Sequence, residues 1–165
     1  MKVYTAHPVP IRYRVRDTIC PAIQALDIHT INPFYEEDGS YRLERPEIQA
    51  MDEGKIKPYD NKAVFVSYDD IVLRDLEKIR SADGLIAIMD DDAVGKSMGI
   101  GTSMEIFYCA RWCKKPVFIV TQKYYNHPWL NYLAKLSGGK VVQSFDELYS
   151  ELQQWKRRED VYEER

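Results

Sequence analysis

The sequence predicts an α/β protein with a doubly wound, three-layer fold around a five-stranded parallel sheet. Short apolar runs alternate along the chain with longer segments whose apolar residues recur at the helical period. Strands that alternate with helices in this way form parallel sheets through right-handed crossovers. The chain has 165 residues, of which 45% are hydrophobic and 30% are charged, and this suits one domain with one core.

The expected strands are short and apolar. Leu85–Met89 is a continuous apolar run, which is typical of a strand covered on both faces by helices. Pro8 and Pro10 punctuate the exit from the first strand, and Asn32 and Pro33 stop the second. The strands are expected at residues 1–6, 28–31, 85–89, 117–120 and 140–142.

The expected helices lie between these strands. The first contains a conflict, because a proline inside a helix cannot donate a backbone hydrogen bond. We therefore expect this helix to begin late, with Asp17 or Thr18 as its N-cap and Pro21 in its first turn. Ser144 and Glu147 form an S-x-x-E capping box that predicts the start of the last helix. The helices are expected within residues 11–26 and at 46–51, 67–82, 102–113, 127–136 and 144–156.

Residues 1–156 are expected to form a single domain. Within it, residues 35–62 are polar and only weakly periodic, and we interpret them as a long excursion over the surface. Loops of this length are uncommon in compact domains and are often functional lids. Residues 157–165 are highly charged and are expected to form a frayed tail.

The composition excludes several classes of function. A net charge of -3 gives no footprint for a nucleic-acid polymer. No stretch approaches the roughly 20 apolar residues of a membrane span, and no apolar leader follows Lys2. The three cysteines lack the spacing of a disulfide scaffold or a zinc site, and they suit a reducing cytosol. We therefore expect a cytoplasmic protein without a metal or a cofactor.

The segment Ser97–Glu105 reads S-M-G-I-G-T-S-M-E and leads from a buried strand into a helix. Such a junction offers free backbone N–H groups to an anion, and Gly99 and Gly101 permit close approach. The helix dipole is expected to keep Glu105 ionised in the first turn, which suits a nucleophile. Thr102 and Glu105 also form a T-x-x-E capping box. On spacing alone, the cap is the better interpretation of this glutamate.

Three further features near this segment have open interpretations. Gly95, Lys96 and Ser97 look like the end of a phosphate loop, but the pattern requires glycine where Asp90 stands, which argues against an NTPase. The acids at 90–92 fit Mg²⁺, sugar hydroxyls or solvent, and the metal is the weakest of these options. His7 follows the first strand and is a candidate to face the crevice at the carboxyl ends of the strands.

Several segments together resemble the nucleoside 2-deoxyribosyltransferase family. They read V-Y-T-A, I-N-P-F, A-D-G-L-I-A-I-M-D, G-T-S-M-E-I and K-P-V-F, and they begin at residues 3, 31, 82, 101 and 115. The resemblance implies a flavodoxin-like or Rossmann-like fold and a double displacement. It implies that Glu105 attacks the anomeric carbon of a nucleoside and forms a glycosyl-enzyme, as the carboxylate of a retaining glycosidase does. This favours catalysis over capping.

The resemblance also assigns roles to two other residues. Tyr4 matches the family tyrosine that orients the nucleophile, although it could equally be a core aromatic. Asp75 matches the family aspartate that shuttles a proton to the leaving base, although it could be a solvated helix acid. Family members are homo-oligomers, and the 12 tyrosines and 3 tryptophans of this chain suit such an interface. The implied partners are a small nucleoside or nucleotide and a nucleobase.

One departure leaves the substrate open. The transferases carry aspartate six residues before the nucleophile, where this chain has Gly99. A sister group, the deoxynucleoside 5'-monophosphate N-hydrolases, has a small residue there and binds a phosphate, which Lys96 and Ser97 would suit. Asp92 is a candidate to fold back and replace the missing acid. Transferase and hydrolase therefore both stay open, as does a non-catalytic nucleotide-binding protein.

The candidate site is thus defined by two groups of residues. The catalytic candidates are Glu105, Tyr4 and Asp75. The substrate-binding candidates are Asp92, Ser97, Gly99, Gly101, Thr102 and His7.

Overall fold

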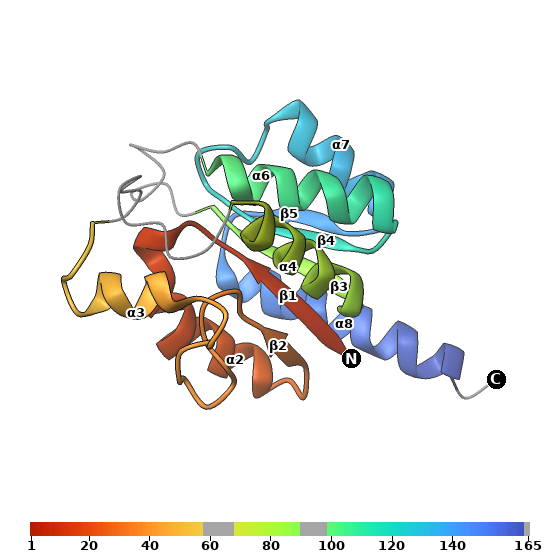
Figure 1. Cartoon of the computed structure of the whole chain (residues 1–165). Helices are drawn as coiled ribbons and strands as arrows, with labels where there is room; N and C mark the ends of the chain where they lie inside the picture. Colours follow the sequence, from red (N-terminus) through yellow and green to blue (C-terminus); the bar gives the residue numbers. More distant parts are fainter. Residues whose placement is uncertain (58–67, 90–98, 164–165) are drawn as a thin grey trace.

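The computed structural model describes residues 1–57, 68–89 and 99–163, and it has the predicted doubly wound α/β fold (Figure 1). Five parallel strands form one sheet in the order β2-β1-β3-β4-β5, which is the flavodoxin-like order. The strands are β1 (Lys2–Ala6), β2 (His29–Ile31), β3 (Gly84–Ile88), β4 (Val117–Val120) and β5 (Lys140–Val142). All five expected strands are confirmed, and no strand end differs from the expected position by more than one residue.

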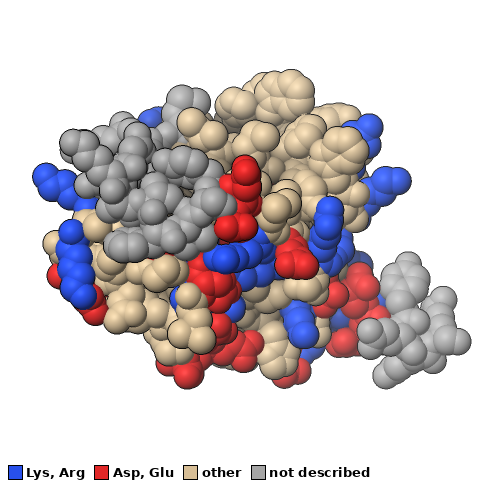
Figure 2. All heavy atoms as spheres, in the orientation of Figure 1, with Lys and Arg blue, Asp and Glu red and all other residues tan. Residues whose placement is uncertain are grey.

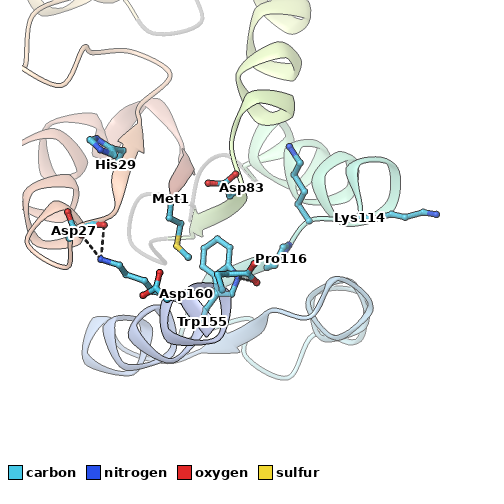
Figure 3. A pocket seen from close by; sticks show the side chains of 11 residues that line it. Met1, Asp27, His29, Asp83, Lys114, Pro116, Trp155 and Asp160 are labelled. Carbon is cyan, nitrogen blue, oxygen red and sulfur yellow. Dashed lines mark hydrogen bonds and ion pairs between the residues drawn. The ribbon is translucent and has the colours of Figure 1, made fainter. Parts of the chain in front are cut away.

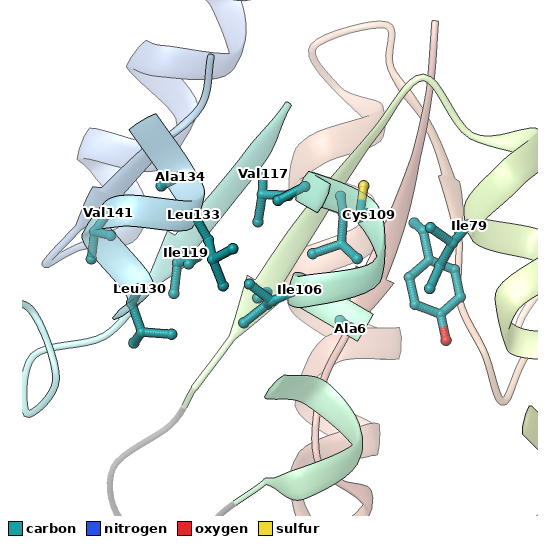
Figure 4. Close-up of a cluster of buried hydrophobic side chains, with 14 of the residues drawn as sticks. Ala6, Ile79, Ile106, Cys109, Val117, Ile119, Leu130, Leu133, Ala134 and Val141 are labelled. Carbon is teal, nitrogen blue, oxygen red and sulfur yellow. The ribbon is translucent and has the colours of Figure 1, made fainter. Parts of the chain in front are cut away.

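Helices cover both faces of the sheet. One face packs against α4 (Tyr68–Ser81), α6 (Ile100–Phe107), its π-helical continuation η3 (Tyr108–Cys113) and α7 (Pro128–Ser137). Figure 4 shows this layer, where Ile106 and Leu133 meet Ile119 of β4. The other face packs against the first helical segment and α8 (Phe145–Glu163). The two apolar layers bury the central strands on both sides, as their unbroken apolar sequences require.

The first helical segment begins earlier than the sequence predicts. It runs through η1 (Val9–Ile11), α1 (Arg12–Arg14), the π-helical η2 (Val15–Ile19) and α2 (Cys20–Gln24). The expected late start with an N-cap at Asp17 or Thr18 is therefore wrong. The wider π-helical turn directly precedes Pro21, so the ring is accommodated where a regular α-helix would lose a hydrogen bond and meet a carbonyl.

The excursion at residues 35–57 is anchored to the domain rather than lying only on its surface. It contains the expected short helix, α3 (Pro46–Asp52). Tyr35 and Ile48 are fully buried and pack with Phe34 in a separate apolar cluster. The Tyr35 hydroxyl donates to Asp52 Oδ2 at 2.8 Å, and Arg12 Nε donates to Asp52 Oδ1 at 2.8 Å. These contacts tie α3 to α1, and residues 58–62 lie outside the described part of the chain.

The last helix confirms one expectation and corrects another. Ser144 Oγ accepts from the Glu147 N–H at 3.2 Å, as a capping box requires, whereas Glu147 Oε2 accepts from the N–H of Gln143 at 2.9 Å rather than from that of Ser144. The helix does not end near Lys156 but continues to Glu163. Residues 157–163 contain no glycine or proline and several strong helix formers, which explains why the charged segment stays helical.

The expected helices over 67–82 and 127–136 are present as α4 and α7, and residue 67 lies outside the described residues. Within residues 1–57, 68–89 and 99–163, no helix has both the length and the apolar character needed to cross a membrane.

We predict that Asp52→Ala lowers the free energy of unfolding by about 3 kcal/mol, because it leaves the Arg12 guanidinium buried without its partner. Urea denaturation would measure this. Asp17→Ala is the matched control, since Asp17 pairs with Arg16 at an exposed position and should cost under about 1 kcal/mol. Equal losses in the two variants would show that the Arg12–Asp52 pair does not anchor α3.

Candidate functional site

The topology places the candidate site at the carboxyl ends of β1 and β3. The strand order reverses at β1, because β2 lies on one side of it and β3 on the other. A crevice forms outside the strand ends at such a switch point. A cavity of about 470 Å³ lies there, lined by residues that follow β1 and β2, by α4 and by the beginning of α6. This is the edge of the sheet at which a ligand is expected.

A hydrogen bond joins β1 to α6 inside this region. The Tyr4 hydroxyl donates to Glu105 Oε1 at 2.7 Å, although the two residues are 101 positions apart. Tyr4 is fully buried, and its burial and the neighbouring Glu105 raise its pKa well above its usual value, so its hydroxyl keeps its proton. Glu105 is half-buried because part of its surface lines the cavity. The tyrosine therefore fixes one oxygen of a carboxyl group that faces open space.

Glu105 does not cap its helix. The α6 helix begins after Gly99, which adopts a left-handed conformation, and the N-cap makes no side-chain hydrogen bond. Glu105 lies in the second turn rather than the first, with its carboxyl group bonded to Tyr4. The T-x-x-E pattern of Thr102 and Glu105 is thus not used as a capping box. The geometry leaves this carboxyl group available to a ligand.

The protonation of Glu105 differs from the expectation. Desolvation, and then the negative charge of Asp75, raise its pKa to about 8, while the Tyr4 hydrogen bond and Arg45 act in the opposite direction. The expected ionisation of Glu105 by the helix dipole is therefore wrong. The dipole acts within the first turn, and Glu105 lies beyond it. Below pH 8, most molecules hold a proton on this group.

Asp75 is not a solvated helix acid. It projects from α4 into the same cavity, and its side chain is only 16% exposed. Arg45 Nη1 lies 3.3 Å from both of its carboxyl oxygens, and Lys78 Nζ lies 4.0 Å from Oδ1. Burial raises the pKa of Asp75, and the two cations oppose that rise. Asp75 and Glu105 thus form a pair of carboxyl groups whose protonation states depend on each other.

Arg45 is the functional candidate that the sequence did not reveal. Its guanidinium also donates to Glu47 and lies 4.9 Å from the centre of the Phe34 ring, where it lines the cavity. It comes from the excursion that the sequence assigns to the surface. An arginine before a short helix is usually exposed. The burial of Arg45 becomes evident only from its acidic partners, and one of them, Asp75, is 30 residues away in the sequence.

His7 lies in the cavity wall directly after β1. Its Nδ1 is 2.8 Å from the carbonyl oxygen of Thr5, and its ring meets Phe34 edge-on, with the two ring centres 5.0 Å apart. Its Nε2 is buried and has no hydrogen-bond partner in the described part of the chain. Desolvation lowers the pKa of His7 to about 4, so the ring is neutral near pH 7.

The beginning of α6 forms another wall of the cavity. Gly99 has a φ of 52°, a conformation that glycine adopts most easily. A Cβ atom placed on Gly101 would have no heavy atom of residues 1–57, 68–89 or 99–163 within 4 Å, which leaves room there for an approaching group. Thr102 is buried and lines the cavity beside them. The first N–H groups of a helix have no partners within the helix, so they can donate to a ligand.

The structure brings together most of the predicted site. Most of these residues line one cavity, namely Glu105, Asp75, His7, Gly99, Gly101 and Thr102. The Tyr4 hydroxyl donates a hydrogen bond to Glu105. Asp92 and Ser97 lie outside the described residues, as do Lys96 and the acids at 90–92. In the described ranges, no group of three or more histidine, cysteine, aspartate or glutamate side chains could hold a metal ion.

A second cavity, of about 640 Å³, lies at the amino ends of the strands (Figure 3). Several of its polar residues have partners within the fold. Lys156 Nζ lies 2.6 Å from Asp27 Oδ2, and Asp83 Oδ2 accepts from the Lys2 N–H at 2.7 Å. Lys115 Nζ donates to the carbonyl oxygen of Ala82. These contacts are structural, and none of the predicted site residues lies here.

Comparison with known proteins gives a likeness of fold. No protein-family model matches the chain, and no curated protein matches it either. Among solved structures, a conserved protein from Enterococcus faecalis V583 is similar, with a TM-score of 0.59 and 20% identity over 93% of this chain and 98% of that one. A 2-deoxyribosyltransferase from Bacillus psychrosaccharolyticus has a TM-score of 0.54 and 16% identity over 90% of each chain. At these identities the comparison shows the shared α/β fold alone.

The raised pKa of Glu105 predicts a pH dependence of stability. Between pH 4.5 and 8 the folded state holds a proton on Glu105 that the unfolded state releases, so folding is stabilised towards the acid end of this range. Glu105→Gln removes this proton linkage. The difference in free energy of unfolding between Glu105→Gln and the original protein should rise by about 2 kcal/mol, in favour of the variant, from pH 5 to 8. This is roughly half the value that the full pKa shift would give, because Glu105 also faces the cavity.

Denaturation curves at several pH values would measure this difference. Glu77→Gln is the control, because Glu77 is an exposed residue of α4 and its substitution should leave the pH profile unchanged. A Glu105→Gln profile parallel to that of the original protein would contradict the protonated state of Glu105.

Proposed function

We propose that the protein cleaves or transfers the N-glycosidic bond of a nucleoside or deoxynucleoside, as a nucleoside 2-deoxyribosyltransferase does. The observation that carries this proposal is the Tyr4–Glu105 hydrogen bond at the switch point of the sheet. It holds a desolvated carboxyl group against a cavity of a size suited to a small molecule. The likeness of fold to a protein named as a 2-deoxyribosyltransferase supports the proposal.

The proposed reaction has two displacements. In the first, a Glu105 carboxylate oxygen bonds to the anomeric carbon while the bond from that carbon to the base nitrogen breaks. Asp75 gives its proton to the departing base. In the second, another base or a water molecule attacks the anomeric carbon, breaks the ester bond to Glu105 and returns a proton to Asp75.

The electrostatics supply the one proton that this reaction needs but hold it on Glu105, so it must move to Asp75 before the first displacement. The first displacement requires one proton on the carboxyl pair, located on Asp75 while Glu105 is ionised. Burial raises the pKa of both groups, and each negative charge disfavours the other, so the pair tends to retain a proton near pH 7. The Tyr4 hydroxyl and Arg45 lower the pKa of Glu105 and support its ionised form. Once ionised, a partly desolvated carboxylate is a stronger nucleophile than one in water.

A second candidate is a nucleoside 5'-monophosphate N-hydrolase. The beginning of α6 favours it, because the N–H groups of a helix N-terminus can receive a phosphate and Gly99 supplies no side-chain cap. The third is a nucleotide-binding protein without turnover. An assay with deoxynucleosides, their monophosphates and free bases separates the three. Base exchange supports the transferase, base release from monophosphates alone supports the hydrolase, and binding without turnover supports the third.

The homo-oligomer stays a prediction, and we propose the outer side of α6 and α7 as its contact surface. Figure 2 shows few charged side chains over these helices. Large apolar side chains are exposed along α6, its continuation η3 and α7, namely Met104, Trp112, Trp129, Tyr132 and Leu136. Exposed aromatic groups in such number favour an interface.

We predict that Glu105→Gln abolishes base release and base exchange, with a loss of at least about 1,000-fold, because the amide cannot form the ester bond. Chromatography of the released base measures the rates. Tyr4→Phe should lower the rate less, by roughly 10- to 100-fold, since it removes one hydrogen bond that aligns the carboxylate. Circular dichroism would show that both variants are folded. A Glu105→Gln protein with near-normal turnover would overturn the mechanism.

We further predict that Gly101→Ala separates activity from stability. The added methyl group meets no atom of the described residues within 4 Å, and alanine favours the helix, so stability should rise by about 0.5 kcal/mol. Turnover should fall at least tenfold, because substrate approaches the backbone here. Gly99→Ala is the comparison, and its left-handed φ should make it less stable by about 1 kcal/mol. Unchanged turnover in Gly101→Ala would show that substrate does not contact this turn.

A further inference from the structure

We infer that His7 selects a nucleoside with an unphosphorylated sugar hydroxyl. His7 Nε2 accepts a hydrogen bond from that hydroxyl, and the hydroxyl oxygen accepts one from a backbone N–H at the beginning of α6. The inference rests on the proposed function for the nature of the ligand. It goes beyond that proposal because it decides between a nucleoside and a nucleotide.

The tautomer of His7 follows from its backbone contact. Nδ1 lies 2.8 Å from the carbonyl oxygen of Thr5, which can only accept a hydrogen bond. Nδ1 must therefore carry the proton. Because desolvation keeps the ring neutral near pH 7, the other nitrogen, Nε2, has an unshared electron pair and no proton. His7 is thus a hydrogen-bond acceptor, with its Nε2 buried in the wall of the cavity.

The unpaired state of Nε2 indicates a ligand. The His7 residue is only 5% exposed, and its ring is held between its own backbone and the Phe34 ring in the cavity wall. A buried acceptor without a partner costs about 1–3 kcal/mol relative to a satisfied one. Such groups are rare in folded proteins, and each one requires an explanation. A donor on the ligand would satisfy this nitrogen.

The chemistry of the cavity favours a hydroxyl over a phosphate. A phosphate dianion has only acceptor oxygens, so it would place lone pairs against Nε2. The Arg45 guanidinium is engaged by Asp75 and Glu47 and is therefore not free to neutralise a phosphate. A hydroxyl can donate to Nε2 and, through its oxygen, accept from an N–H at the beginning of α6. The pairing of one acceptor with backbone donors thus matches a hydroxyl.

Binding and turnover of the full chain test this inference separately. The probes are thymidine, 2'-deoxyadenosine, 2'-deoxyguanosine and 2'-deoxycytidine, and their 3'- and 5'-monophosphates. The sugar hydroxyl is identified with analogues that lack the 3'- or the 5'-hydroxyl. Calorimetry measures affinity, and chromatography of the same samples measures base release, so that a failure of the proposed function is scored independently.

Two variants separate the two contacts of His7: His7→Asn keeps the contact with the backbone, and His7→Gln keeps the contact with the ligand. In His7→Asn, the side-chain amide can still donate to the Thr5 carbonyl, but no acceptor remains at the position of Nε2. In His7→Gln, the longer side chain can place an amide oxygen near that position. We expect roughly tenfold weaker nucleoside binding by His7→Asn and a smaller loss in His7→Gln. For the analogue that lacks the contacted hydroxyl, His7→Asn should cause no further loss.

The inference also predicts that the original protein binds the nucleoside more tightly than the monophosphate carrying its phosphate on that same hydroxyl. Tighter binding of that monophosphate would overturn it. Equal affinities of His7→Asn and the original protein for the nucleoside would do the same, as would the absence of binding to all four nucleosides. His7-dependent binding without base release would support the recognition of a hydroxyl while rejecting the proposed catalysis.

Discussion

The hydrogen bond between Tyr4 and Glu105 is the contact on which the candidate site depends. It joins β1 to α6, the helix that follows β3, and it directs a carboxyl group into the cavity instead of towards its own helix. Desolvation makes the ionisation of Glu105 costly, and the Tyr4 hydroxyl offsets part of that cost. The position of β1 between β2 and β3 makes this arrangement possible, because both partners meet at the switch point.

Arg45 balances negative charge in the site, and it comes from the excursion at residues 35–57 rather than from one of the regularly alternating strands and helices. Asp75 and Glu47 both contact Arg45, while Glu105 has the hydrogen bond from Tyr4 and feels Arg45 at longer range. A buried guanidinium with two acidic partners is stable only if the excursion stays in place. The contacts that anchor α3 therefore also support the electrostatics of the site. The excursion acts as a wall of the cavity and not only as a surface loop.

The sequence predicted the strands from their apolar runs. It suggested His7 because this residue follows a strand, and Glu105 and Asp75 through the resemblance, and the fold brings all three to one cavity. It missed Arg45, because its partner Asp75 is 30 residues away and nothing local indicates burial. It also misjudged the first helix, since the effect of Pro21 depends on a π-helical turn that propensities do not predict. The prediction that Glu105 is ionised was wrong for a related reason. Helix position alone suggested ionisation, whereas desolvation depends on the whole surrounding fold.

The two helix starts of this chain show that the site has a cost in local stability. The α8 helix begins with side-chain contacts of Ser144 and Glu147 to backbone N–H groups, so the chain can cap a helix well. The α6 helix begins instead with a left-handed Gly99, no side-chain cap and a second glycine, Gly101, inside its first turn. A glycine within a helix, such as Gly101, weakens that helix by about 0.5–1 kcal/mol relative to alanine. This glycine lies where the helix lines the cavity, which is where local rules are expected to yield to function.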